Sequence, residues 1–451
     1  MVPLPETAVT APAPTRRTGV RADLLAGGAA VLLVAAASAV GQYLNQHTGV
    51  RIFAGAPPLF GVWQPHLGPG TPLAVLVAVL VVTRGPDLAS ALPWPRLLLA
   101  GYATAVAWTL ALATVDGWRV GVAGRLATTD EYLHEVGGIT DIGALLRGFA
   151  GRVLDFQPDS WTTHVAGHPP GATLVFVWLD RIGLSGGGWA ALCCVLVGSL
   201  AAVAVPVALR ELGAARAARA AVPFAVLFPG AVWLGVSADA VFTGVTSVGV
   251  ALLAVSAARR LVLPGLAAGV LLGFGLFLSY GLVLMAVPAL AVCLLARDWR
   301  ALVLAGLGAA AVVAVFAAAG FWWLDGYHLV VARYYQGIAS ARPYGYWVWA
   351  NLACLVLAVG PAAAAGVRRA LRPTTARALP ALAVLTLAGL GAVLLADVSG
   401  LSKAEVERIW LPFAGWLVAA CALLPAPARR WWLAAQAVTA LAVNHLVLTN
   451  W

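Results

Sequence analysis

The sequence predicts an all-α polytopic membrane protein. Three observations lead to that class: a very high hydrophobic share, apolar runs along the whole chain, and an uneven distribution of basic residues. Of the 451 residues, 62% are hydrophobic and 10% are charged, whereas soluble domains have about half apolar and about a quarter charged residues. The apolar runs alternate with short charged or Pro/Gly-rich connections, and a run of about 20 residues can cross a bilayer as a helix.

We expect thirteen membrane-spanning helices, with the N-terminus in the cytoplasm. In chain order the spans are predicted at residues 24–43, 70–83, 96–115, 189–209, 220–236, 238–257, 262–278, 281–296, 301–323, 346–366, 377–396, 410–424 and 431–449. Residues 1–22 are rich in Pro, Thr and Ala and lack the early apolar core of a signal peptide, so they predict a disordered cytoplasmic tail.

The distribution of basic residues supports this orientation. With a cytoplasmic N-terminus, the predicted inner segments contain 18 of the 28 basic residues but only 5 of the 18 acidic ones. The inner side is then strongly positive and the outer side slightly negative, as the positive-inside rule requires. The net charge of +10 therefore reports membrane topology, and no nucleic-acid partner is expected.

Polar residues gather in three outer segments, residues 116–188, 324–346 and 397–409. No Asp, Glu, Lys or Arg lies in the middle of a predicted span, which argues against an ion-driven transporter because a coupling ion needs a ligand there. The inner loops are short and contain no Gly-rich phosphate loop or dinucleotide fingerprint. We therefore expect any chemistry on the outer face of a cell membrane, with an activated substrate that arrives attached to lipid.

The stretch "WTTHVAGHPPG", from Trp161 to Gly171, ends the first outer segment. Before it, residues 142–154 have helical spacing with one apolar side, as expected of a helix lying in the membrane interface. After it, "GATLVFVWLDRIGL" is apolar but too short to span comfortably, which predicts a second interfacial helix. Pro169 and Pro170 suit the first turn of that helix. His168 then lies at its start, although the prolines could simply begin a helix and the histidines hydrogen-bond to nearby loops.

These features resemble the GT-C superfamily of polyprenyl-phosphate-sugar-dependent membrane glycosyltransferases, to which protein O-mannosyltransferases and the lipid A aminoarabinose transferase belong. The likeness begins with an acidic pair just beyond a span, Asp130 and Glu131 in "TTDEYLHEV", followed by interfacial helices, "HPPG" and a span that ends in basic residues. "SADAVFTG" around Asp239 looks like the acidic residue that many members hold at the outer end of a following span. In "GFGLFLSYGLVLM", where many members have a lysine before the tyrosine, this chain has Ser279 before Tyr280.

The resemblance also implies a division of the chain. It covers residues 96–300 by order of elements, which are expected to form a GT-C-like catalytic module with the outer loop 116–188. Residues 23–95 are expected to be an added N-terminal transmembrane hairpin, because the acidic pair here follows the third span rather than the first. Residues 301–451 form a C-terminal transmembrane region with outer loops at 324–346 and 397–409.

In this family a hydroxyl attacks the anomeric carbon of a polyprenyl-phospho-sugar and expels the lipid phosphate, usually with inversion, so a base and a phosphate ligand are needed. The resemblance implies that Asp130 is the base, with Glu131 orienting or replacing it; the pair could instead complement a helix dipole. His164 and His168, four residues apart, would orient the acceptor or bind a divalent metal together with a carboxylate. Asp239 would contact substrate or support a residue that does.

The donor phosphate needs positive charge at the membrane surface. Arg408, beside Trp410 in the third outer segment, is the first candidate ligand, and Lys403, the only lysine, is the second. Glu405 and Glu407 indicate that part of this charge is paired. The remaining candidates are Arg333 and Arg342 in the second outer segment, and Tyr280 from the family's tyrosine position.

Three functions remain open at this level. The first is an outer-face hexosyltransferase, most plausibly a mannosyltransferase if the Ala-, Gly- and Arg-rich composition reflects an actinobacterial source. Its partners would be a polyprenyl-phosphate-linked sugar donor, membrane lipids, and a glycan, glycolipid or protein acceptor. The second is a transporter or flippase of lipid-linked glycans, and a non-catalytic scaffold is a third option. The absence of charges in mid-span and the acidic pair followed by His-Pro-Pro favour the enzyme.

Overall fold

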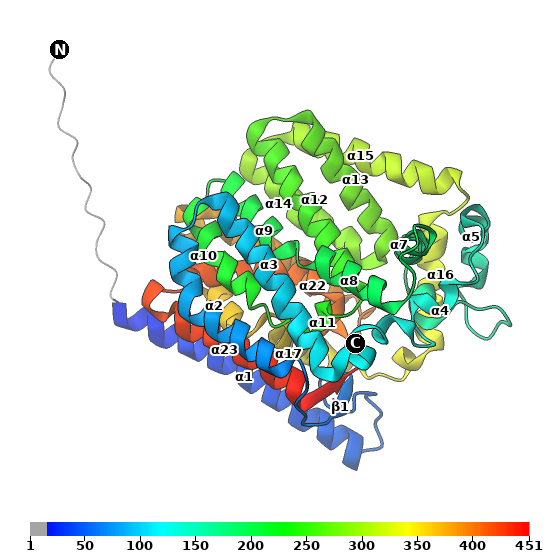
Figure 1. The fold of residues 1–451 in the computed structure, drawn as a ribbon, viewed down its shortest axis with the longest axis horizontal. Coiled ribbons are helices and arrows are strands. Elements are labelled where there is room, and N and C mark those ends of the chain that lie inside the picture. Colours follow the sequence, from blue (N-terminus) through cyan, green and yellow to red (C-terminus); the bar gives the residue numbers. More distant parts are fainter. Residues whose placement is uncertain (1–15, 451) are drawn as a thin grey trace.

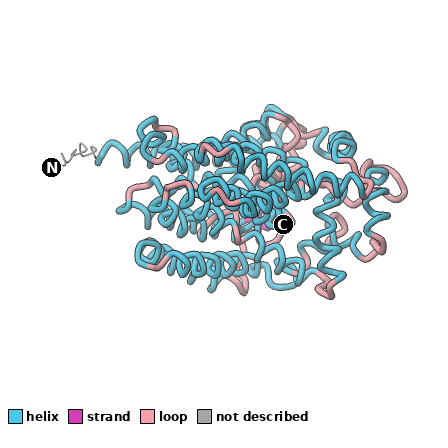
Figure 2. Tube along the Cα trace, turned by 90° about the horizontal axis from the view of Figure 1, so that it is seen from above, coloured by secondary structure: helices cyan, strands magenta, loops and turns pink. Residues whose placement is uncertain are grey.

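The structure, a computed structural model, describes residues 16–450 as a bundle of long helices with short helices and loops gathered at one end (Figure 1, Figure 2). Of the predicted tail, residues 1–22, the first fifteen lie outside the described part of the chain. Its remaining residues belong to the first helix, so for them the prediction of disorder is wrong.

The first half of the described chain contains α1 (Arg16–His47), β1 (Gly61–Trp63), α2 (Thr71–Ala91), α3 (Trp94–Ala113), α4 (Tyr132–Val136), α5 (Ile142–Gly148), α6 (Thr163–Gly167), α7 (Pro170–Arg181), α8 (Gly187–Gly198), α9 (Ala201–Glu211), α10 (Ala215–Val226), α11 (Ala231–Leu234) and α12 (Asp239–Arg259). The second half contains α13 (Val262–Leu278), α14 (Ala286–Ala296), α15 (Trp299–Ala318), α16 (Trp323–Gln336), α17 (Tyr344–Val359), α18 (Pro361–Ala370), α19 (Pro373–Ala378), α20 (Pro380–Val398), α21 (Val406–Ile409), α22 (Leu411–Ala419), α23 (Arg429–Leu446) and β2 (Val447–Thr449). Short 3₁₀ or π helices lie at Thr114–Asp116, Gly117–Val122, Arg125–Ala127, Ala150–Arg152, Tyr280–Met285, Ile338–Ser340, Ala420–Leu423 and Ala426–Ala428.

The prediction of a polytopic all-α membrane protein is confirmed, but the count of thirteen spans is not. Within residues 16–450, seven helices are long and apolar enough to cross a membrane, or nine if each of two bent pairs forms one span. One bent pair is α17 with α18, which meet at 103°, and the other is residues 411–423 with α23, at 116°. The predicted span 220–236 is split into α10 and α11 by the turn at residues 227–230.

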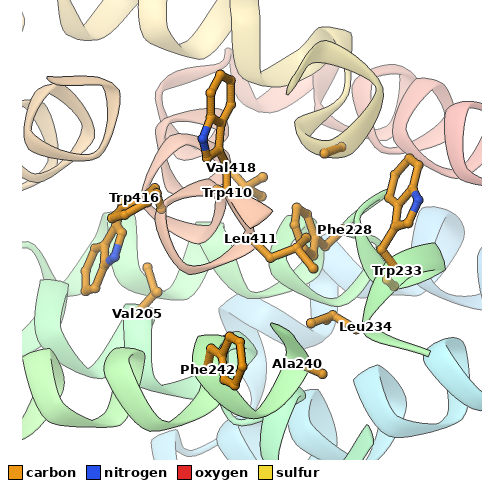
Figure 3. Packing of buried hydrophobic residues seen from close by; sticks show 14 of the residues in the cluster. Val205, Phe228, Trp233, Leu234, Ala240, Phe242, Trp410, Leu411, Trp416 and Val418 are labelled. Atoms are coloured by element: carbon orange, nitrogen blue, oxygen red, sulfur yellow. The ribbon is translucent and has the colours of Figure 1, made fainter. Parts of the chain in front are cut away.

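The helix α12 lies at the centre of the bundle, whereas α1, α2 and α15 lie at its edge. In the most apolar window of α12, 78% of the residues are buried, against 22% for each of the three edge helices. The core around the start of α12 is made of large apolar side chains: Figure 3 shows Phe242 of α12 with Phe228, Leu234 and Leu411 nearby. This packing fixes the first turn of α12, from which Asp239 projects.

The helix α7 confirms the expected short helix after His-Pro-Pro. It begins at Pro170 and is 12 residues long, too short for a span. Gly171 in its first turn packs directly against α13, since a Cβ atom there would lie 2.5 Å from the carbonyl oxygen of Phe277. The glycine after the two prolines therefore sets how closely α7 approaches the bundle.

The predicted amphipathic helix at 142–154 is present as α5 and the 3₁₀ turn that follows it. Its apolar residues, among them Leu145 and Leu146, are buried, and Phe149 packs its ring at 5.5 Å from both Trp161 and Phe321. The apolar side thus contacts protein, not the lipid interface that the sequence analysis expected.

The last residues of the described chain pair with a short strand in the segment between α1 and α2. Strands β1 and β2 pair antiparallel, with Val62 opposite Leu448. Arg125 in the first long loop donates from Nη1 to the carbonyl oxygen of Thr449 at 2.5 Å and forms an ion pair with Asp116 at 2.6 Å. The predicted N-terminal hairpin is therefore bound to the last residues of the chain on the same side of the bundle.

Candidate active site

Four short segments meet at one end of the bundle and bring most of the predicted site residues together. Asp130 and Glu131 directly precede α4, and His164 lies in α6. Asp239 is the first residue of α12, and Arg408 lies in α21. The backbone N–H of His164 donates to the carbonyl oxygen of Asp130 at 3.0 Å, which ties the first two segments to each other.

Arg408 is the centre of this charged cluster. Its Nη1 donates to Oδ2 of Asp239 at 2.8 Å, and its Nη2 donates to Oε2 of Glu405 at 3.0 Å and lies 3.1 Å from Nε2 of His164. Arg408 and Asp239 are only 5% and 3% exposed. Burial alone would lower the pKa of Arg408, but the charges of Asp239 and Glu405 outweigh it and raise that pKa, so the guanidinium remains charged.

His164 connects Arg408 to Glu131. Its Nδ1 lies 3.1 Å from Oε1 of Glu131 and 3.1 Å from the carbonyl oxygen of Asp130. Because a guanidinium can only donate, Nε2 accepts from Arg408 and the ring proton is on Nδ1. Burial, and then the charge of Arg408, lower the pKa of His164 well below its usual value, in agreement with a neutral ring.

Glu131 is buried, in contrast to its neighbour Asp130. It is 7% exposed, and burial raises the pKa of its carboxyl group to about 7, partly opposed by the charge of Arg408. Asp130 is exposed, and its Oδ1 accepts a hydrogen bond from the hydroxyl of Thr163 at 3.1 Å. A molecule arriving from water can therefore reach Asp130 directly, whereas Glu131 acts on the cluster through His164.

His168 directly follows α6 and precedes the two prolines at the start of α7. Its Nδ1 lies 2.8 Å from the carbonyl oxygen of His164 and 2.8 Å from the hydroxyl of Tyr132. A carbonyl oxygen can only accept, so Nδ1 carries the ring proton and Nε2 holds the lone pair. Burial lowers the pKa of His168, which favours this neutral form with a basic Nε2.

A second group of charges adjoins the cluster through Glu405. Arg342 contacts Oε1 of Glu405 from both Nη1 and Nη2 at 3.2 Å, and its Nη1 donates to the carbonyl oxygen of Lys403 at 2.8 Å. The ammonium group of Lys403 donates to the carbonyl oxygen of Arg342 at 3.2 Å. Burial, and then the charge of Arg342, lower the pKa of Lys403. The expected pairing of Glu405 with the basic residues is thus confirmed.

Two of the candidate phosphate ligands lie apart from the Arg408 cluster. Arg333 forms an ion pair with Asp155 at 2.7 Å. Tyr280 packs its ring against Trp323 and Tyr327 of α16, at centroid distances of 5.3 and 6.0 Å. The structure therefore favours Arg408 and Arg342 over Arg333 and Tyr280 as groups that could share one anion.

The histidine pair does not form a metal-binding arrangement. Within residues 16–450 no group of three or more His, Cys, Asp or Glu side chains has the geometry to hold a metal ion. Both ring nitrogens of His164 face protein partners, and Nδ1 of His168 is engaged with a carbonyl oxygen. The four-residue spacing instead allows the ring of His168 to donate a hydrogen bond to the backbone carbonyl oxygen of His164.

Sequence reasoning missed two residues of this site and the role of a third. It predicts that Glu405 pairs with basic neighbours, but not that Glu405 bridges Arg342 and Arg408. Tyr132 and Thr163 hydrogen-bond to His168 and Asp130, and the only available signal was their position next to the acidic pair and next to His164.

Comparison with known proteins gives a coarse structural likeness. No protein-family model matches the chain, and no curated protein matches it. ArnT from Cupriavidus metallidurans is similar in its apo state, with a TM-score of 0.43 and 20% identity over 67% of this chain and 54% of ArnT. Its structure bound to undecaprenyl phosphate gives a TM-score of 0.43 and 18% identity over 74% of this chain and 60% of ArnT.

The oligosaccharyltransferase of Archaeoglobus fulgidus, tethered to an acceptor peptide, is also similar, with a TM-score of 0.42 and 14% identity over 72% of this chain and 49% of that enzyme. These neighbours are GT-C glycosyltransferases, the superfamily whose motifs the sequence resembles. The chain spans roughly half to three fifths of their length. At these identities and TM-scores the likeness concerns the arrangement of helices, and the function proposed below rests on this chain's own residues.

Proposed function

We propose that this chain is an integral membrane glycosyltransferase that moves a sugar, in the first instance mannose, from a polyprenyl-phosphate donor to an acceptor hydroxyl on the extracytoplasmic face. The observation that carries the proposal is that Asp130 and Arg408 flank His164: the backbone carbonyl oxygen of Asp130, whose carboxylate is exposed, lies 3.1 Å from Nδ1, and the buried, charged guanidinium of Arg408 lies 3.1 Å from Nε2. A base for an acceptor hydroxyl and a cation for a departing phosphate are what such a transfer needs.

The proposed reaction has one displacement step. Asp130 takes the proton of the acceptor hydroxyl, whose oxygen forms a bond to the anomeric carbon of the donor sugar. The bond from that carbon to the phosphate oxygen breaks, and its electron pair leaves with the polyprenyl phosphate. Arg408 stabilises the charge that grows on the phosphate, and attack from the opposite side of the sugar inverts the anomeric centre. The acceptor is a glycan, a glycolipid or a protein.

The other polar groups have supporting roles in this proposal. Glu131 and Asp239 hold His164 and Arg408 in place from two sides, with contacts of 3.1 and 2.8 Å. The lone pair on Nε2 of His168 can accept a hydrogen bond from a sugar or acceptor hydroxyl. Because Glu131, His164, Arg408 and Asp239 are already connected, the guanidinium of Arg408 is held in place when the donor arrives.

A transporter or flippase of lipid-linked glycans is the alternative. It would use the same lipid-linked substrate and would need no base. It predicts that a carboxylate at the exposed position 130 can be neutralised without losing function, so Asp130 distinguishes the two proposals.

The test is transfer of labelled mannose from polyprenyl-phospho-mannose to endogenous acceptors in membranes that contain the wild-type chain or Asp130→Asn at equal expression. Asparagine keeps the oxygen that accepts from Thr163 but cannot take a proton at neutral pH. We expect the transfer rate of Asp130→Asn to fall by about 10²- to 10⁴-fold. Asp159→Asn is the matched control, because Asp159 is an exposed carboxylate of the same outer loop outside the cluster, and its rate should equal that of the wild type.

Each outcome has a clear consequence. Full activity of Asp130→Asn would remove Asp130 as the base. If no sugar transfer depends on the chain at all, the transporter becomes the preferred function. If the wild-type chain transfers no mannose, a pentose donor is the next substrate, since the cluster itself does not select the sugar.

A further inference from the structure

Glu405 lies between two buried arginines, as a bound anion would. Its Oε1 accepts from both Nη atoms of Arg342 at 3.2 Å, and its Oε2 accepts from Nη2 of Arg408 at 3.0 Å. Arginine forks commonly bind carboxylate and phosphate oxygens in this manner. One carboxylate therefore fills a site made by two guanidinium groups.

The order of burial indicates that this site opens outward. The side chains of Arg342 and Arg408 are 4% and 6% exposed, while that of Glu405 is 17% exposed. Glu405 thus covers the arginines on the side from which a ligand would come. Nε of Arg342 is buried and has no hydrogen-bond partner among the described residues, so the site has a donor that the carboxylate leaves unused.

The backbone that holds Glu405 in this position is unfavourable for its residues. Ala404 and Glu405 have φ values of +71° and +64°, two consecutive non-glycine residues in the left-handed region. Such a conformation costs free energy relative to the right-handed one. A rearrangement that moved Glu405 away from the arginines could release part of this cost.

Charge balance identifies the class of ligand that could replace Glu405. Arg342 and Arg408 carry two positive charges, and their carboxylate partners are Glu405 and Asp239. When Glu405 moves away, Asp239 remains and the two arginines keep one unbalanced positive charge. A phosphodiester carries one negative charge and offers two free oxygens, so it restores the balance and can fill the fork.

We propose that the carboxylate of Glu405 is an internal stand-in for the donor phosphate, and that the phosphate of a polyprenyl-phospho-sugar binds between Arg342 and Arg408 by displacing it. This inference rests on the proposed function and adds to it the position of the phosphate and the group that leaves. Glu405 closes the site, so the apparent affinity for the donor is proportional to the fraction of molecules in which Glu405 has moved away.

The experiment measures the dissociation constant of undecaprenyl-phospho-mannose, a phosphodiester, for the purified full chain in detergent. Glu405→Gln removes the competing charge, and we expect its dissociation constant to be about tenfold lower than that of the wild type. Ala404→Gly removes strain from the closed state, because glycine adopts the left-handed region without penalty. We expect the dissociation constant of Ala404→Gly to be about fivefold higher.

Asp155→Asn is the matched control, because it removes the same charge from the partner of a different outer arginine, Arg333. Its affinity should not change. Three results would overturn this inference. They are an equal gain of donor affinity in Asp155→Asn, a lower or unchanged donor affinity in Glu405→Gln, and no donor binding to any variant. The transfer assay on the wild type separates the two proposals. If the wild-type chain transfers sugar but Glu405→Gln binds the donor less tightly, the proposed function stands and only this inference is wrong.

Discussion

Glu407 is next to Arg408 in the chain but has different neighbours. It is 1% exposed and forms a hydrogen bond with the thiol of Cys354, and its Oε2 has no partner among the residues that the structure describes. Burial raises the pKa of its carboxyl group from the usual 4.5 to about 7. Glu407 is therefore protonated in weakly acidic solution and becomes a buried, poorly compensated charge as the pH rises.

This carboxyl group should make the stability of the protein depend on pH. The folded chain binds the proton of Glu407 more tightly than the unfolded chain does, so the free energy of unfolding falls as the pH rises from about 4.5 to about 7 and is unaffected outside that window. We expect the melting temperature of the wild type in detergent to decrease between pH 5 and pH 8, and the decrease to be clearly smaller in Glu407→Gln. Glu135→Gln removes a partly exposed carboxylate, and its melting temperature should decrease between pH 5 and pH 8 as much as that of the wild type. Equal decreases in all three proteins would show that Glu407 does not carry the effect.

Single residues of the site could be found in the sequence, but their pairings could not. Asp239 and Arg408 were notable because polar side chains are rare in this chain and each lies at the outer end of a span. Their ion pair joins positions 169 residues apart, and no local pattern encodes such a separation. The role of Glu405 was hidden for the same reason, since one of its two partners, Arg342, lies 63 residues away.

At the scale of elements, the start of α7 links the His-Pro-Pro motif to the bundle. Pro170 begins the helix, where its missing N–H is no loss, and Gly171 brings the first turn against the end of α13. His168 stands immediately before this turn, and its imidazole is held by the backbone of α6 and by Tyr132. The position of His168 therefore depends on a contact between two helices.

Gly171→Ala should disturb this arrangement. The added methyl group would lie 2.5 Å from the carbonyl oxygen of Phe277, so the backbone of α7 or α13 must move, and overpacking of this kind typically costs about 1–3 kcal/mol. We expect a lower melting temperature together with a reduced transfer rate, because His168 moves with α7. Gly183→Ala is no suitable control, since Gly183 has φ of +84°. Gly167 is the control, because a Cβ atom there would meet open space. Gly167→Ala should leave the melting temperature and the transfer rate unchanged. If Gly171→Ala leaves both unchanged as well, the contact has no such role.

Hydropathy predicted where helices occur better than it predicted how they cross the membrane. The boundaries of α12 and α13 agree with the predicted spans 238–257 and 262–278 to within a few residues. The segment 220–236 is just as apolar, yet it forms two short helices whose side chains are mostly buried in the bundle. Apolar residues are required equally by lipid and by a protein interior, so hydropathy alone cannot distinguish a span from a buried half-helix.

At the scale of the whole molecule, the ion pairs agree with the predicted division of the charged residues between two sides of the membrane. Thirteen ion pairs occur among the described residues, and each joins two residues that the sequence analysis places on the same side. Asp23, for example, is bound by Arg368 and Arg369, all three at the predicted inner end. The charges thus fall into two separate sets at opposite ends of the bundle, as expected when an apolar layer lies between them.

Labelling of single cysteines tests this orientation. Phe156 is 82% exposed in the long loop beside the site, and Ala215 is exposed at the start of α10, on the predicted inner side. We expect Phe156→Cys to react with a membrane-impermeant maleimide in intact cells and Ala215→Cys to react only after the membrane is opened. The native chain serves as the blank, because its five cysteines are buried or nearly so. The reverse pattern would place the candidate site on the cytoplasmic face.

The long separations within the cluster also have a consequence for biosynthesis. His164 and Arg408 are 244 residues apart, and at translation rates of 5–20 residues per second roughly 10 to 50 s pass between their emergence from the ribosome. During that interval Asp239 and Glu131 are already synthesised without the guanidinium that later neutralises them. The half-formed bundle must therefore keep these carboxyl groups in water or protonated, and it can close around them only when the last third of the chain has been inserted.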